Sequence, residues 1–141
     1  MNFQTIELTV ADLFARLTLK RPQWANAINP VMSEELWLAT IACEEPPEVR
    51  AMLIIGEGRF FSAGGDLGSF AGAGPAIGEQ LAKMTYFIHG AFSSAGDEYE
   101  TQMEREARAI IAAAKGAEGQ EGIAAFLAKR GPNFLTLERG K

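Results

Sequence analysis

Apolar and polar residues alternate in two runs near the start of the chain, on either side of Ala11-Asp12. The apolar positions of the two runs are Ile6, Leu8, Val10, Leu13, Ala15, Leu17 and Leu19. A period of two places such positions on one face of a strand. The pattern therefore predicts a two-stranded antiparallel hairpin with one buried face. Arg21-Pro22 ends the hairpin, because proline cannot donate a hydrogen bond to a sheet.

The apolar spacing becomes helical after Asn29-Pro30. One helical face carries Met32, Leu36, Ala39 and Cys43. Asparagine caps helices and proline fits the first helical turn, so the helix is expected to begin at Pro30. The run Glu44-Glu45-Pro46-Pro47 then ends it, because prolines cannot continue a helix.

A continuous apolar run, Ala51 to Ile55, predicts a strand that is covered on both faces. After the turn Gly56-Glu57-Gly58, the segment Arg59 to Leu67 reads R-F-F-S-A-G-G-D-L. Paired glycines let the backbone approach a ligand closely, and Asp66 can cap a helix that starts after it. Such a turn presents backbone N–H groups beside a helix N-terminus, which suits a developing negative charge. The same residues also fit a plain strand–turn–helix without chemistry.

The second half of the chain is predicted to be mostly helical. We expect a mobile loop over Phe70 to Pro75, a break over Ala91 to Gly96, and helices over Ile77 to Ile88, Asp97 to Lys115 and Glu118 to Arg130. Gly116 should stop the second of these helices, and the spacing of Glu104 and Arg108 suits an ion pair within it. The expected apolar face of the last helix consists of Ile123, Phe126 and Leu127.

This order of elements predicts an α/β (α+β) class. We expect a single domain over residues 1–141, with an N-terminal strand and helix core over 1–90 and C-terminal helices over 97–134.

The composition mainly argues against certain partners and kinds of site. The chain has 141 residues, a net charge of −5 and no block of Lys or Arg, which argues against nucleic acid and anionic membranes as partners. Cys43 is the only cysteine and His89 the only histidine, so no intrachain disulfide can form and no metal site is expected. A cytoplasmic location fits this cysteine usage. No apolar run approaches the length of a membrane span, about 20 residues.

Three segments together resemble the crotonase superfamily, the enoyl-CoA hydratase/isomerase family. Leu17 to Asn29 reads L-T-L-K-R-P-Q-W-A-N-A-I-N and is similar to the family's L-N-R-P…N-A-L-N. Ala51 to Leu67 is similar to the family's strand followed by G-x-G-x-x-F-S-A-G-A-D-L. Glu121 to Phe134 is similar to its C-terminal E-G-x-x-A-F-x-E-K-R-x-P-x-F. The three segments occur in family order and cover the N-terminal half and the C-terminal third.

The resemblance also implies an internally shortened member. The family's central P-x-x-A-x-x-x-G-x-x-x-G-G segment, which supplies a second oxyanion donor, has no match here, and neither do the usual catalytic carboxylates. By position, Gly65 matches the residue whose N–H gives the first donor to a thioester carbonyl. Two sources of a second donor stay open: the backbone of Gly72-Ala73-Gly74, or a partner subunit.

The same resemblance implies coenzyme A thioester as the ligand. The positions that match the family's contacts to the nucleotide and pantetheine are Ala25, Ala27, Ala63, Gly65, Asp66 and Leu67. The alternative is that the alanines only pack against a neighbouring helix. No general base is assigned, because Glu57 and Asp66 are better interpreted as a surface turn and a helix cap, and His89 as packed or solvated. Phe60-Phe61 is expected in the core.

Two interpretations of function stay open. The first is an acyl-CoA-binding crotonase-like protein with half an oxyanion hole, and with lyase- or isomerase-type activity if any reaction survives. The second is a non-catalytic oligomeric remnant or interaction protein without a CoA ligand; a helical adaptor built on Asp97 to Arg130 has only generic support. Both main interpretations predict a homo-oligomer, because missing sheet strands leave apolar faces uncovered. The acyl group and the reaction type are not encoded in any pattern of the sequence.

Overall fold

The computed structural model describes residues 2–44, 49–92 and 108–134. The chain divides into two compact units, residues 1–66 with 84–94, and residues 67–83 with 95–141. The expected single domain, with parts 1–90 and 97–134, stays a prediction.

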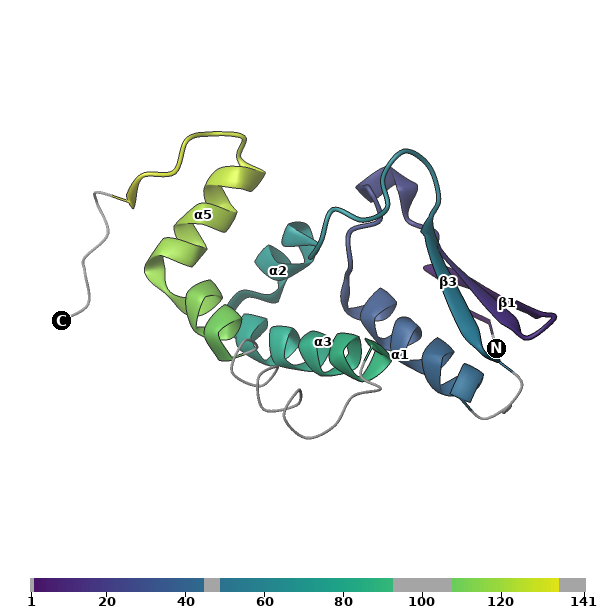
Figure 1. Ribbon diagram of the computed structural model, residues 1–141. Helices are drawn as coiled ribbons and strands as arrows, with labels where there is room; N and C mark the ends of the chain where they lie inside the picture. Colours follow the sequence, from purple (N-terminus) through teal and green to yellow (C-terminus); the bar gives the residue numbers. More distant parts are fainter. Residues whose placement is uncertain (1, 45–48, 93–107, 135–141) are drawn as a thin grey trace. The chain divides into compact units, whose positions relative to one another are not determined.

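A three-stranded mixed sheet forms the centre of the first unit (Figure 1). Strands β1 (Ile6–Ala11) and β2 (Phe14–Leu19) pair antiparallel, so the predicted hairpin is confirmed. Its turn lies at Asp12 and Leu13, with φ of 49° and 73°, one residue later than expected. Strand β3 (Ala51–Gly56) pairs parallel with β2, which gives the order β1-β2-β3. The combination of this sheet with helices is the predicted α/β (α+β) class.

Helix α1 (Pro30–Glu44) packs on one face of this sheet. Asn29 caps it as predicted, since its Oδ1 accepts the Met32 N–H at 2.9 Å. The core between helix and sheet consists of Ile6, Leu17, Leu19, Met32, Leu36 and Ala39. Cys43 lies on the same buried face, as expected, and burial raises the pKa of its thiol. The predicted helix and its apolar stripe are therefore confirmed; residues 45–48 after it lie outside the described residues.

Strand β3 corrects one expectation. Its side chains alternate, with Met52 and Ile54 partly buried against the core and Ala51 and Leu53 exposed. Leu53 is 60% exposed, so the expectation of a strand covered on both faces was wrong for the residues that the structure describes. The run is apolar throughout, but within the described part of the chain only one of its faces meets a helix.

A second correction concerns residues 70–75. These residues form helix α2 (Leu67–Ala73) and the start of a short 3-10 turn (Gly74–Ala76), not a loop. Alanine is the strongest helix former, which outweighs the glycines of this stretch. Helix α3 (Ile77–Phe92) follows, four residues longer than predicted, so Ala91 is helical and not part of a break. Residues 93–96 of the expected break lie outside the described residues.

Helix α3 contributes residues 84–92 to the first unit and residues 77–83 to the second. In the first unit, Trp37 of α1 packs against Phe87 and Tyr86, with ring centroids 5.2 and 6.1 Å apart. A Cβ on Gly90 would lie 2.8 Å from the Trp37 ring. Gly90 therefore lets α3 approach α1 closely.

The described part of the second unit also contains residues 108–115, which are helical, and helix α5 (Ala117–Leu127). The predicted stop at Gly116 is confirmed. Of the predicted apolar face of α5, Ile123 is half-buried, but Phe126 is 65% exposed and Leu127 is exposed as well. Ala125, which was not predicted, is the buried residue of this helix. The expected start at Asp97 lies outside the described residues, and so does Glu104 of the expected Glu104–Arg108 pair. No helix among the described residues is long and apolar enough to cross a membrane.

Candidate functional site

The predicted glycine turn lies against the segment that follows the hairpin. Backbone hydrogen bonds join the two segments: Ala63 N–H to Ala25 O at 2.9 Å, Ile28 N–H to Gly64 O at 2.7 Å, and Asp66 N–H to Ile28 O at 2.9 Å. A parallel bridge pairs Ile28 with Gly65. Two of the three segments quoted above, separated by more than twenty residues in the sequence, therefore form one local structure.

The buried side chain of Asn26 holds this local structure together. Its side chain is fully buried, its Oδ1 accepts the Arg21 N–H at 2.9 Å, and its Nδ2 donates to Glu57 O and Phe60 O at 2.9 and 2.8 Å. The Ser62 hydroxyl donates to the Asn26 carbonyl at 2.9 Å. Sequence reasoning missed this role, although the N-A pair of the first segment contains the residue. A buried amide with three satisfied hydrogen bonds rigidifies the turn.

An ion pair closes the same structure. Arg21 Nη2 lies 2.9 Å from Asp66 Oδ2, and the two side chains are only 9% and 16% exposed. Arg21 Nη1 donates to Ala27 O, and the guanidinium lies 4.6 Å from the centroid of the Trp24 ring. Sequence reasoning used Arg21 only as the end of the hairpin and missed this contact.

Gly65 presents a backbone N–H that the rest of the turn does not use. In the adjacent positions, Asp66 N–H donates to Ile28 O and Gly64 N–H to the Ser62 hydroxyl at 3.1 Å. Within the described ranges, the Gly65 N–H donates to no backbone or side-chain acceptor, and the residue is exposed. Gly64 has φ of +87°, a backbone conformation that glycine tolerates best, and this sets the direction of the next amide. The turn therefore holds one exposed donor in a fixed place.

The other predicted binding residues differ in exposure. Ala27 is buried, Ala25 is half-buried, and Ala63 is exposed beside Gly65. Asp66 is half-buried in its ion pair. These four lie with Gly65 in the first unit, whereas Leu67 begins α2 in the second. The structure thus brings together five of the six predicted positions.

The Phe60-Phe61 pair is not in the core. The two side chains are 53% and 60% exposed, and the Arg59 guanidinium lies 5.4 Å from the Phe60 ring centroid. The expectation of burial was therefore wrong: the backbone carbonyl of Phe60, and not its ring, meets the buried Asn26 amide.

Acid–base groups are sparse around this turn. Glu57 is exposed on the turn after β3, where its N–H donates to Leu19 O at 2.9 Å. His89 is half-buried on α3. Gly72 and Ala73 lie within α2 and Gly74 begins the 3-10 turn, all in the second unit. No group of three His, Cys, Asp or Glu side chains among the described residues could hold a metal ion.

The third quoted segment forms a separate local structure in the second unit. Arg130 Nη1 and Nη2 bind the Glu121 carboxylate at 2.6 and 2.9 Å, and Glu121 Oε1 also accepts the Asn133 N–H at 2.7 Å. The hydrogen bonds from Arg130 and Asn133 lower the pKa of Glu121 to about 2. The E…K-R-x-P spacing therefore has a physical meaning: the glutamate closes the end of α5.

Comparison with known proteins agrees with the first two segments. A family model described as Enoyl-CoA hydratase/isomerase matches residues 11–91. A Bacillus subtilis protein named "Probable enoyl-CoA hydratase" is 45% identical over 65 residues, which are 46% of this chain and 25% of the relative. A protein of the same name from Rhodobacter capsulatus is 38% identical over 74 residues, 52% of this chain and 28% of the relative. The chain thus spans about a quarter of the length of these relatives.

The fold comparison gives the same answer. The crystal structure of an enoyl-CoA hydratase/isomerase from Xanthobacter autotrophicus matches 62% of this chain and 34% of its own, with a TM-score of 0.57 and 29% identity. Residues 11–91 contain the last residue of β1, all of β2, α1, β3, the turn with Gly65, α2 and nearly all of α3. The hairpin, the clamped turn and these matches all lead to one conclusion: this chain belongs to the enoyl-CoA hydratase/isomerase family, within the crotonase superfamily.

Proposed function

We propose that this chain binds an acyl-CoA thioester, with the Gly65 N–H donating to the thioester carbonyl. The observation that carries the proposal is the exposed amide of Gly65, which has no acceptor among the described residues, in a turn held by Asn26 and the Arg21–Asp66 pair. A donor that is already in place costs no reorganisation when a carbonyl arrives. Ala25 and Ala63 beside it carry small side chains, which leave the backbone accessible to a bent ligand.

Binding, not turnover, is the function that these residues support. An oxyanion hole works through converging donors, and removing one donor typically costs about a hundredfold or more in rate. The chain has no sequence match to the family's second donor segment or catalytic carboxylates. Any residual activity would be of the hydratase or isomerase type that the relatives' names describe.

The test distinguishes a contact with the thioester carbonyl from contacts with the rest of the ligand. We would titrate the chain with an acyl-CoA thioester, the matching S-alkyl-CoA thioether and free CoA, and follow the thermal midpoint. The thioester should stabilise the chain more than the thioether, because only the thioester can accept the Gly65 hydrogen bond. Equal shifts for thioester and thioether would contradict the role of Gly65, and no shift with millimolar thioester would contradict binding altogether.

A matched pair of glycine variants locates the site. Gly64→Ala introduces no clash but strains a residue with φ of +87°, so it should displace the Gly65 amide and abolish the preference for the thioester. Gly122→Ala in α5 also meets open space, without positive φ, and should leave the preference unchanged. A thioester preference that survives Gly64→Ala would place the carbonyl elsewhere.

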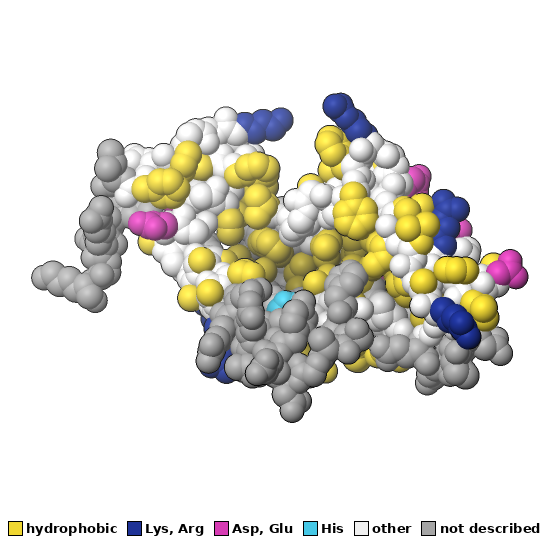
Figure 2. All heavy atoms as spheres, viewed as in Figure 1, with side chains coloured by type: hydrophobic (Ala, Val, Ile, Leu, Met, Phe, Trp, Pro, Cys, Tyr) yellow, Lys and Arg dark blue, Asp and Glu magenta, His cyan; other side chains and the backbone are white. Residues whose placement is uncertain are grey.

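The second candidate is a non-catalytic oligomer, favoured by a specific observation. Apolar side chains lie at the surface over the strands (Figure 2), and exposed large residues there include Phe14 and Leu53. We propose a homo-oligomer for either function, because such residues are normally covered. A cytoplasmic location remains proposed on the single cysteine.

A further inference from the structure

The two edges of the sheet differ in how they are protected. Strand β1 carries Glu7, whose carboxylate lies 3.1 Å from the Lys20 ammonium. Strand β3 reads A-M-L-I-I-G, with no charged residue and no proline. Natural edge strands usually carry such residues, because an unprotected edge pairs with another strand. The edge formed by β3 therefore has the composition of a strand that is normally paired.

The backbone of β3 offers hydrogen-bonding groups at that edge. Lys20 N–H donates to Thr5 O, so alternate residues of β2, beginning with Leu19, turn their backbone groups toward β3. The bond from Glu57 N–H to Leu19 O agrees with this assignment. Ala51, Leu53 and Ile55 then bind β2, which leaves the N–H and C=O groups of Met52 and Ile54 at the outer edge. No strand among the described residues pairs with them.

We propose that this edge pairs antiparallel with β3 of a second copy of the chain, about a two-fold axis at Leu53. This register places Met52 opposite Ile54 of the other copy, and each such pair exchanges two N–H···O bonds. Leu53 then faces its own counterpart, and Ala51 faces Ile55. Every side chain from position 51 to position 55 meets an apolar one, and Leu53, 60% exposed in one chain, becomes covered.

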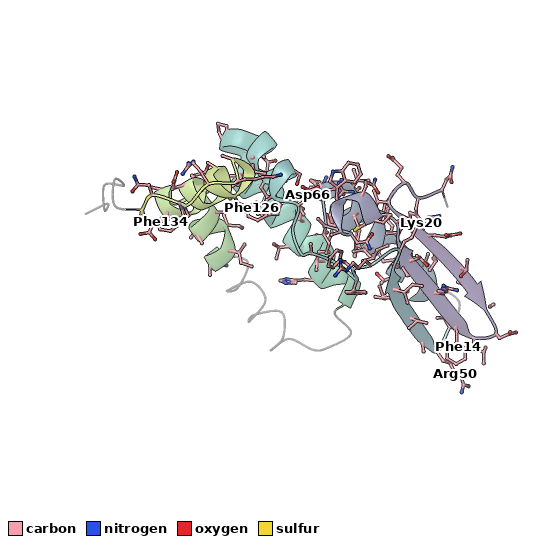
Figure 3. All side chains as sticks on the ribbon, turned by 90° about the horizontal axis from the view of Figure 1, so that it is seen from above. Phe14, Lys20, Arg50, Asp66, Phe126 and Phe134 are labelled. Atoms are coloured by element: carbon pink, nitrogen blue, oxygen red, sulfur yellow. The ribbon has the colours of Figure 1, made fainter. Side chains whose placement is uncertain are left out.

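Charge favours a second copy in this orientation. Arg50 precedes the strand and Glu57 follows it, and both are exposed. Antiparallel pairing brings the basic start of one strand beside the acidic end of the other, whereas parallel pairing would bring like charges together. Figure 3 shows Arg50 with Phe14 at one end of the sheet, where Arg50 N–H donates to Leu13 O at 2.8 Å, so the start of β3 is held in place. The interface uses the sheet alone and does not depend on CoA binding.

The first test breaks the pairing. Leu53→Lys places two ammonium groups opposite each other and should weaken self-association of the full chain by about a hundredfold, measured by sedimentation velocity. Val10→Lys is the control, because Val10 is also an exposed apolar residue but lies on β1, at the other edge. It should leave the association unchanged. A monomeric wild-type chain, or a Leu53→Lys variant that associates like the wild type, would overturn the proposal.

The second test captures the pairing without requiring a destabilising change. Directly opposed residues in a non-hydrogen-bonded pair have Cα atoms about 4.5 Å apart, which suits a disulfide. Leu53→Cys should therefore form a covalent dimer under mild oxidation. Arg16→Cys should not, because Arg16 is paired with Leu53 one strand inward, about 14 Å from its counterpart. An oligomeric chain in which Leu53→Cys fails to cross-link would leave self-association standing but exclude this interface.

Discussion

Two arginine–carboxylate pairs among the described residues look alike and serve different purposes. Arg21 and Asp66 lie 45 residues apart in sequence, and their side chains are nearly buried. Arg130 and Glu121 lie 9 residues apart, and the Arg130 side chain is 46% exposed. The first pair joins two distant segments around Gly65, and the second closes the end of one helix. Sequence distance and burial, not the bond itself, decide what each pair stabilises.

The largest expected effect comes from breaking the buried pair. Arg21→Ala removes the ion pair with Asp66 Oδ2 and the donor to Ala27 O. Breaking a buried ion pair costs about 3 kcal/mol or more, which corresponds to about 10 °C in the thermal midpoint. Arg16→Ala, an arginine on the outer face of β2, is the control and should shift the midpoint far less. Equal shifts for the two variants would show that the pair does not hold the turn.

A slightly smaller effect is expected for the amide beside the pair. Asn26→Ala leaves the Arg21 N–H, the Glu57 carbonyl and the Phe60 carbonyl without their partner. Unsatisfied buried groups cost about 1–3 kcal/mol each, although water can reach some of them after the change. We expect a loss of about 2–3 kcal/mol together with loss of thioester binding, measured by urea unfolding and the titration described above. Normal binding by Asn26→Ala would show that the ion pair alone is sufficient.

Breaking the partly exposed pair should matter least for global stability. Arg130→Ala removes both bonds to Glu121, but the Arg130 side chain is 46% exposed, so water can take its place, and the Asn133 N–H still binds the carboxylate. We expect a small shift of the thermal midpoint and faster amide hydrogen exchange at Asn133, whose N–H also binds Glu121. A midpoint shift as large as that of Arg21→Ala would remove the distinction between the two pairs.

The pH dependence of the second pair gives the finest comparison. The pKa of Glu121 is lowered from 4.5 to about 2 by its hydrogen bonds to Arg130 and Asn133. The unfolded chain therefore takes up this proton at a higher pH than the folded chain. The stabilisation is present above pH 4.5 and is lost as the pH falls to about 2. Carboxyl NMR titration should show a return toward 4.5 in Arg130→Ala; an unchanged value would exclude Arg130 as the main cause.

Local signals in the sequence predicted the elements well. The alternation of apolar and polar residues predicted the hairpin. The Asn29-Pro30 pair predicted the start of α1, and Gly116 predicted the helix end that precedes α5. Each of these features depends on residues a few positions apart, whose steric and hydrogen-bonding preferences act within one strand or one helical turn. The stretch from 70 to 75 is an exception, because alanine's helix preference and glycine's turn preference compete there.

Burial and long-range contacts were decided only by the tertiary structure. Leu53, Phe60 and Phe126 are as apolar as the core residues, yet each is exposed, because no element among the described residues packs on its side. In the sequence, Arg21 was interpreted only as the end of the hairpin. Its contact with Asp66, 45 residues later, exists only in the folded chain. Hydrophobicity determines which residues gain from burial, but only the packing of distant segments determines which of them find a partner. The sequence by itself thus determined the elements and the family resemblance, and the tertiary structure decided that Gly65 stands in a clamped turn with its amide exposed.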